Sequence, residues 1–406
     1  MRQSIYAMAT MDTKGDELCF VADCVRRTGH NVVLVDLSTR GASDRADVTA
    51  RTVAEAHPDG PDAVLGQTDR GQAVTAMAEA LRNWLSSQAA SEKVAGVIAL
   101  GGSGGTAIVS PALQALPIGM PKLVVSTMAS GNTLPYVGHS DITMMYSVVD
   151  VAGLNTVSRR VLSNAAHAIA GMVAHTAAIP NDRATVGMTM FGVTTPCVDS
   201  VRESLEAKGL DALVFHATGT GGQAMEKLVA DGLIDGVLDI TTTEVADEVV
   251  GGVLPSGPQR FDVILQRGIP YVMSLGALDM VNFGARATVP ERFADRQFVV
   301  HNSQVTLMRT TAEENRQIAR WIAAKVNRST APLEILIPEQ GVSMLDAAGQ
   351  AFFDPEIDRS LFETLEQEVE QTDARRVTRH DCHINDSAFA AALVAAFERV
   401  SGSRFQ

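Results

Sequence analysis

The sequence has 406 residues, of which 46% are hydrophobic and 20% charged, and its formal net charge is −14. A chain of this length can bury the cores of two globular domains, and the strong negative charge argues against a nucleic acid or an anionic membrane as its main partner. The four cysteines include no CxxC pair, which argues against disulfides and structural zinc. The N-terminus has no signal-peptide core and no apolar run reaches about 18 residues, so we expect a cytoplasmic protein.

Strand-like and helix-like segments alternate along both halves of the chain. The first half has expected strands at 4–9, 31–38, 94–100, 121–132 and 141–149, and expected helices at 16–28, 49–56, 70–90 and 154–177. After a polar break at 179–183, strands are expected at 184–192, 211–219, 235–244, 270–279, 332–341 and 377–385. Helices are expected near 197–208, 220–231, 258–268, 311–328, 356–371 and 386–400.

This alternation is typical of parallel sheets covered by helices on both faces. We therefore predict an α/β protein with two doubly wound, Rossmann-like parallel-sheet lobes and a cleft between them. The lobes are expected at residues 1–180 and 184–406.

Residues 94–109, VAGVIALGGSGGTAIV, join a buried strand to a glycine-rich loop and a helix. Such a loop can hold a phosphate, because the missing side chains let backbone N–H groups at the start of the helix approach the anion. A tight turn is the structural alternative. The loop is neither GxxxxGK[ST] nor GxGxxG, so no motif names its ligand. Its residues are Gly101, Gly102, Ser103, Gly104, Gly105 and Thr106.

In a doubly wound sheet, ligands bind beyond the carboxyl ends of the strands. In the first lobe, Lys14 follows the first strand, where it either contacts phosphate or is a solvated turn residue. Asp12 either holds a metal ion through water or caps the next helix, and Asp36 lies roughly where dinucleotide folds place a ribose carboxylate. The candidates of this lobe, besides the glycine loop, are Asp12, Thr13, Lys14, Asp36, Thr127 and Met128.

The second lobe has its own glycine loop at 219–222, and four polar residues lie at or just beyond its predicted strand ends: Glu244, Asp279, His301 and Arg309. We predict that they form a catalytic site. Arg309 and the helix N-terminus would bind a carboxylate or phosphate, and Glu244 or Asp279 would act as general base. The structural alternative is that Glu244 caps or salt-bridges the helix that begins near it. The histidines show neither HxH nor HExxH spacing, so we predict no metal ion held by them.

Several longer segments together carry a resemblance: DTKGDE (12–17), STMASGN (126–132), DITMMYSVVDVAGLN (141–155), HATGTGGQAME (216–226), DITTTEVADEVVGGVL (239–254) and HNSQVTLMRTTAEEN (301–315). Over nearly its whole length the chain resembles the family of the ATP-binding amino-terminal domain of the tomato mosaic virus resistance protein, which has many bacterial and fungal relatives of unassigned function. The resemblance implies two Rossmann-like subdomains, ATP and Mg²⁺ bound in the first lobe, and a homodimer. It implies nucleotide contacts for Asp12, Thr13, Lys14, residues 101–106, Thr127 and Met128.

Two functions follow as hypotheses. The first is a nucleotide-dependent enzyme that acts on a small polar metabolite, and the alternative is a non-catalytic, ATP-responsive binding or regulatory protein. An NAD-dependent oxidoreductase is disfavoured because GxGxxG is absent. We also expect slow ATP hydrolysis, since no Walker lysine follows the loop and Ser103 stands where related-looking kinase loops have a carboxylate.

Overall fold

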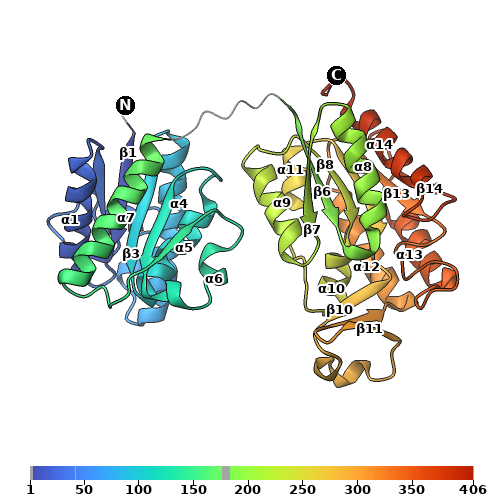
Figure 1. The fold of residues 1–406 in the computed structure, drawn as a ribbon, viewed down its shortest axis with the longest axis horizontal. Helices are drawn as coiled ribbons and strands as arrows, with labels where there is room; N and C mark the ends of the chain where they lie inside the picture. The colour runs from blue at the N-terminus through green and yellow to red at the C-terminus, as the bar shows by residue number, and fades with distance from the viewer. Residues whose placement is uncertain (1–2, 42, 176–182, 406) are drawn as a thin grey trace. The chain divides into compact units, whose positions relative to one another are not determined.

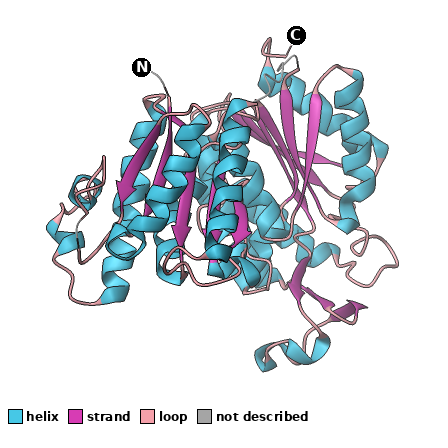
Figure 2. Cartoon of the chain, turned by 60° about the vertical axis from the view of Figure 1, so that its left-hand side comes forward, coloured by secondary structure: helices cyan, strands magenta, loops and turns pink. Residues whose placement is uncertain are grey.

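The computed structural model describes residues 3–41, 43–175 and 183–405. The chain forms two compact units, residues 1–179 and 180–406, each with its own core. In each unit, helices cover the strands of a sheet (Figure 1; Figure 2). The two units are described separately. Among the described residues, no helix is both long and apolar enough to cross a bilayer.

Unit 1 contains a five-stranded parallel sheet with the order β2-β1-β3-β4-β5. Its strands are β1 (Ser4–Ala9), β2 (Val32–Asp36), β3 (Val94–Gly101), β4 (Lys122–Ser126) and β5 (Thr143–Tyr146). Its helices are α1 (Met11–Arg27), α2 (Ala50–Ala54), α3 (Asp62–Leu65), α4 (Arg70–Ala90), α5 (Ser103–Ala115), α6 (Leu134–Val137) and α7 (Thr156–Ala174), with a 3₁₀ turn η1 (Thr127–Ser130). Helices α1 and α7 pack on one face of the sheet, and α2, α4 and α5 on the other.

Unit 2 contains a six-stranded parallel sheet with the order β14-β13-β9-β8-β6-β7. Its strands are β6 (Thr185–Met190), β7 (Asp211–His216), β8 (Gly236–Thr241), β9 (Tyr271–Gly276), β13 (Leu333–Pro338) and β14 (Arg375–His380). Helices α8 (Thr195–Ala207) and α14 (Ser387–Ser401) cover one face. The other face packs against α9 (Thr220–Ala230), α10 (Thr243–Val250), α11 (Asp262–Arg267), α12 (Ala312–Val326) and α13 (Pro355–Glu368). The predicted fold class, α/β with two Rossmann-like parallel sheets, is confirmed.

A three-stranded antiparallel sheet in unit 2 was missing from the sequence prediction. Its order is β10-β12-β11, with β10 (Met280–Phe283), β11 (Phe298–Asn302) and β12 (Val305–Arg309). Two 3₁₀ turns, η3 (Arg286–Thr288) and η4 (Glu291–Phe293), lie between β10 and β11. The strand expected at 270–279 ends at Gly276, and β10 begins only four residues later. These short strands have no clear alternating pattern: β10 is wholly buried, whereas the end of β11 is exposed.

Several predicted boundaries shift in the structure. The helix expected near 258–268 spans only Asp262–Arg267. The expected first helix is extended at its start by one turn, Met11–Thr13, which a non-helical Lys14 (φ −131°, ψ 21°) separates from the rest. The helix expected at 154–177 spans Thr156–Ala174, and the last two residues of that prediction lie outside the described residues.

Candidate functional site

The strand order of unit 1 reverses between β1 and β3. The chain passes from β1 to β2 on one side and then to β3 on the other. In sheets of this order the loops that follow the two central strands diverge and leave a crevice at the carboxyl edge. A cavity of about 580 Å³ lies at this edge of unit 1. Its lining comprises Thr10, Asp12, Thr13, Lys14, Thr39, Arg40, Arg70, Val74, Gly102, Ser103, Gly104, Gly105, Ile108, Thr127 and Asp150.

One of the four loop glycines, Gly101, is explained by packing. A Cβ on Gly101 would lie 2.9 Å from the Gly105 carbonyl carbon and from the Thr106 nitrogen, so the strand and the helix could not approach as they do. A Cβ on Gly105 would lie 3.4 Å from the Leu100 oxygen, which is ordinary contact.

Gly102 and Gly104 have still more room for a side chain than Gly105. A Cβ on Gly102 would come no closer than 3.8 Å to Thr127, and one on Gly104 no closer than 3.8 Å to Arg70. Neither residue has a positive φ. Neither the backbone conformation nor packing therefore requires glycine at Gly102 or Gly104. Both residues face the cavity. Close approach of a ligand to the backbone would account for glycine at both positions.

The cavity combines a helix N-terminus with positive side chains. Helix α5 begins at Ser103, and its N-cap residue Gly102 has no side chain to accept from the first N–H groups. Lys14, Arg40 and Arg70 line the same cavity. Arg70 is the first residue of α4, a position where the helix dipole disfavours a cation. A bound anion would offset that cost, so the electrostatics of the cavity favour a phosphate or carboxylate ligand.

Four predicted nucleotide contacts of the first lobe lie outside the lining: Asp36, Gly101, Thr106 and Met128. Asp36 is buried, and its Oδ1 accepts from the Met11 N–H (3.0 Å) and the Ser38 N–H (2.9 Å). Asp36 thereby fixes the start of α1, which follows β1. Because Asp36 does not line the cavity, its position argues against ribose binding. Thr106 is also buried, and its hydroxyl donates to the Gly102 oxygen (2.8 Å). The N–H of Met128 donates to the Ser126 Oγ at 2.9 Å. The other predicted contacts in the cavity lining are Asp12, Thr13, Lys14, Gly102, Ser103, Gly104, Gly105 and Thr127.

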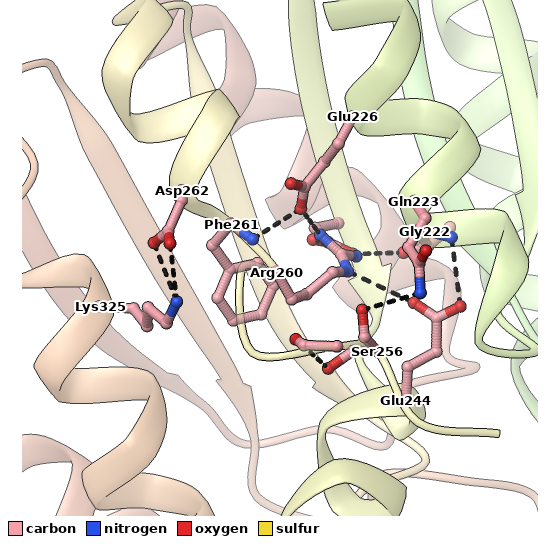
Figure 3. Close-up of polar contacts among 12 residues, drawn as sticks. Gly222, Gln223, Glu226, Glu244, Ser256, Arg260, Phe261, Asp262 and Lys325 are labelled. Carbon is pink, nitrogen blue, oxygen red and sulfur yellow. Dashed lines mark hydrogen bonds and ion pairs between the residues drawn. The ribbon is translucent and has the colours of Figure 1, made fainter. Parts of the chain in front are cut away.

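The glycine loop of unit 2 is occupied by a side chain of its own unit (Figure 3). Glu244 Oε1 accepts from the Gly219 N–H (2.8 Å) and the Gly222 N–H (3.1 Å) at the start of α9. A Cβ on Gly222 would lie 2.2 Å from Glu244 Oε2, and one on Gly221 would lie 1.9 Å from the His216 oxygen. Packing explains these glycines, and Glu244 supplies the anion that a phosphate would otherwise provide.

Glu244 belongs to a buried ionic network centred on Arg260. The guanidinium donates through Nε to Glu244 (3.3 Å), through Nη1 to Glu226 (2.9 Å) and through Nη2 to Asp239 (2.8 Å). Burial alone would lower the pKa of Arg260, but the three carboxylates, Asp239 foremost, raise it well above its usual value. Burial raises the pKa of Glu226. The structure therefore favours the structural alternative for Glu244 over the role of general base.

The other predicted catalytic residues of unit 2 are only partly brought together. Arg309 Nη1 donates to the Asp279 carbonyl oxygen (3.3 Å), and Arg309 Nη2 donates to Asp358 (2.6 Å). Asp279 and Asp346 are buried beside them, and burial raises the pKa of Asp279 to about 6 and that of Asp346 to about 9. His301 lies instead on the exposed part of β11. A shared catalytic site of Glu244, Asp279, His301 and Arg309 stays a prediction.

The crevice of unit 2 at the equivalent strand reversal, between β6 and β8, is bridged by its own side chains. The hydroxyls of Thr194 and Thr241 lie 2.7 Å apart. Asn385 donates to the Val193 oxygen (3.0 Å) and accepts from the Cys197 N–H (3.3 Å). Of the two crevices, that of unit 1 therefore has the better geometry for a ligand.

Sequence reasoning missed seven residues of the cavity lining: Thr10, Thr39, Arg40, Arg70, Val74, Ile108 and Asp150. Arg70 carries the one usable signal, because it is a cation in the first turn of a helix that Asp69 caps. Arg40 and Asp150 lie in irregular segments without a motif, and only the fold brings them to the loop.

Comparison with known proteins places the chain in a family. Residues 3–178 match the N-terminal domain, and residues 183–401 the C-terminal domain, of uncharacterised protein family UPF0261. The chain belongs to this family. A UPF0261 protein of Rhizobium meliloti is 54% identical over 98% of this chain and 99% of its own length. A UPF0261 protein of Clostridium tetani is 46% identical over 97% of this chain and 98% of its own length.

The tomato relative is longer. The ToMV resistance protein Tm-1(GCR237) of Solanum lycopersicum is 46% identical over 98% of this chain, which corresponds to 56% of the tomato protein. The suspected family is thus confirmed. This match covers both units of the present chain.

Proposed function

We propose that unit 1 binds ATP together with Mg²⁺, with the phosphates at the N-terminus of α5. The observation that carries the proposal is the pair Gly102 and Gly104. Both face the cavity, although neither the backbone conformation nor packing requires glycine there. Their N–H groups and those of the first turn of α5 can approach an anion without a side chain between them.

The remaining residues of the cavity fit this ligand. A volume of about 580 Å³ lies within the range of about 300–1,000 Å³ typical of small-molecule sites. Lys14, Arg40 and Arg70 supply positive charge for a polyphosphate. Asp12 and Asp150 supply carboxylate oxygens, the ligands that Mg²⁺ prefers alongside phosphate oxygens.

Catalysis is a separate matter from binding. As a nucleotide-dependent enzyme acting on a small polar metabolite, the protein would need free acid–base groups near the reacting atoms. Glu244 and Arg309, our sequence-based candidates, are held in buried ion pairs, which favours the alternative of an ATP-responsive binding protein. A rise in ATP turnover on addition of a carboxylate or phosphate metabolite would instead support the enzyme.

Isothermal titration calorimetry with charge-neutralising variants tests the site. Arg70→Met should weaken ATP binding about 5- to 50-fold, as expected when one charged contact to a phosphate is lost. Arg82→Met is the matched control, since Arg82 is exposed on the same helix outside the cavity lining. Equal ATP affinities of wild type and Arg70→Met would contradict the proposed site.

A further inference from the structure

Residues 147–153 cross beside the cavity between β5 and α7, and we call them the strap. Asp150 of the strap lines the cavity, whereas Val148 is 56% exposed. A void of about 10 Å³, lined in part by Ser147 and Val151, lies under the strap. The strap therefore borders the cavity.

The backbone of the strap is strained at one position. Val148 has a φ of 65°, in the left-handed region that a β-branched residue rarely adopts. Such strain persists only where neighbouring contacts hold it, and it is frequent in segments that respond to ligands.

Two side chains of α1 hold the strap. The Lys14 ammonium donates to the carbonyl oxygen of Val151, and the Glu17 carboxylate accepts from the N–H of Gly153. Ser158 at the start of α7 donates to the carbonyl oxygen of Gly153 (3.1 Å). Glu17 is only 2% exposed and lies outside the cavity lining. Lys14, in contrast, lines the cavity and contacts the strap at the same time.

We propose that the strap responds to occupancy of the cavity by a polyphosphate, with Lys14 as the coupling side chain and Asp150 as the residue that faces the ligand. An ammonium group has three donors. One of them reaches Val151, so another can reach a phosphate oxygen. A bound phosphate then fixes Lys14 from the other side and makes its hydrogen bond to the strap more persistent. This inference rests on the proposed function of unit 1.

Hydrogen exchange on the intact protein tests the coupling. With saturating ATP and Mg²⁺, strap amides should exchange at least about 3-fold more slowly than without nucleotide, because the phosphate makes more persistent the Lys14 hydrogen bond that local opening must break. Calorimetry on the same sample decides whether ATP binds. Absence of binding overturns both proposals, whereas binding with unchanged strap exchange overturns this inference alone.

A positioning variant separates coupling from direct contact. Glu17→Ala removes an anchor of the strap without removing any cavity-lining side chain, and should weaken ATP binding about 3- to 10-fold. Glu17→Gln keeps an oxygen that accepts from Gly153 and should bind ATP nearly as wild type does. Asp23→Ala, an exposed change on the same helix, is the control. Wild-type affinity of Glu17→Ala would overturn the coupling.

Asp150 is exposed, so its replacement leaves the fold intact and gives an independent readout. Asp150→Asn should weaken binding of ATP with Mg²⁺, because a carboxylate that can meet the cation is lost. It should strengthen binding of ATP in a chelator, because the carboxylate then repels the phosphates. Equal effects in both conditions would show that Asp150 does not face the ligand.

Discussion

The contrast between structural and catalytic roles is sharpest at Glu244, and we expect Glu244→Gln to destabilise unit 2. The carboxylate accepts from the Gly219 and Gly222 N–H groups at 2.8 and 3.1 Å and from Arg260 Nε at 3.3 Å. Glutamine keeps one carbonyl oxygen for the two backbone donors. Its NH₂ group then faces the Nε–H of Arg260. Two hydrogen-bond donors are thus placed together, and no hydrogen bond can form between them.

The magnitude follows from these contacts. Hydrogen bonds to charged groups contribute about 1.5–3 kcal/mol each, and breaking a buried pair costs about 3–5 kcal/mol. Because two of the three contacts survive in neutral form, we expect a loss of about 3 kcal/mol in the free energy of unfolding of unit 2. For a domain of this size that corresponds to a fall in Tm of about 6–12 °C.

Thermal denaturation followed by circular dichroism, with calorimetric ATP titration of the same sample, is the assay. ATP affinity should be unchanged, since Glu244 lies in unit 2. Glu248→Gln is the control: Glu248 accepts one N–H, from Gly257 at 2.9 Å, and its partial exposure should limit the loss to less than about 1 kcal/mol. A variant Glu244→Gln with wild-type Tm would refute the structural role.

The remaining predictions concern packing, pH and assembly. Gly222→Ala should destabilise unit 2 by about 2–4 kcal/mol in urea denaturation, because its Cβ would clash with Glu244, whereas Gly192→Ala, with nothing within 4 Å, should be nearly neutral. Burial raises the pKa of Asp346 to about 9, so the folded state retains a proton that the unfolded state loses from about pH 4 upward. The free energy of unfolding should therefore fall as the pH rises from about 4 to about 9. The fall should be less steep in Asp346→Asn. The family resemblance implies a homodimer. Light scattering at micromolar concentration should therefore give twice the 43.0 kDa chain mass, and a monomer mass would exclude the homodimer.

The sequence could predict the repeated strand–helix pattern, because buried parallel strands are short apolar runs and the helices between them have a different period. It could also predict the glycine loop after β3, because strand, glycines and helix are contiguous there. It could not distinguish this loop from the one at 219–222. Both are rich in glycine, contain a hydroxyl residue and precede a helix, and only the folded position of Glu244, 22 residues beyond Gly222, fills one of them.

The charged residues show the same limit. Arg260 and Arg70 are both single arginines in polar stretches, yet one is 2% exposed among three carboxylates and the other is exposed at a cavity. Burial and partners depend on contacts between residues far apart in the sequence. The antiparallel strands β10, β11 and β12 were missed for a related reason, since their pairing rather than their composition defines them.

The measurement that tests the central claim most directly is calorimetric titration of ATP with Mg²⁺ into wild type, Gly102→Val and Gly104→Val. Gly171→Val, in the last turn of α7 with nothing within 4 Å of its Cβ, is the matched control. We expect wild type and the control to bind alike. Both loop variants should lose at least about 10-fold in affinity, equivalent to about 1.4 kcal/mol, because a branched side chain separates the backbone from the phosphates. Unchanged affinity in both loop variants would show that the loop is only a turn.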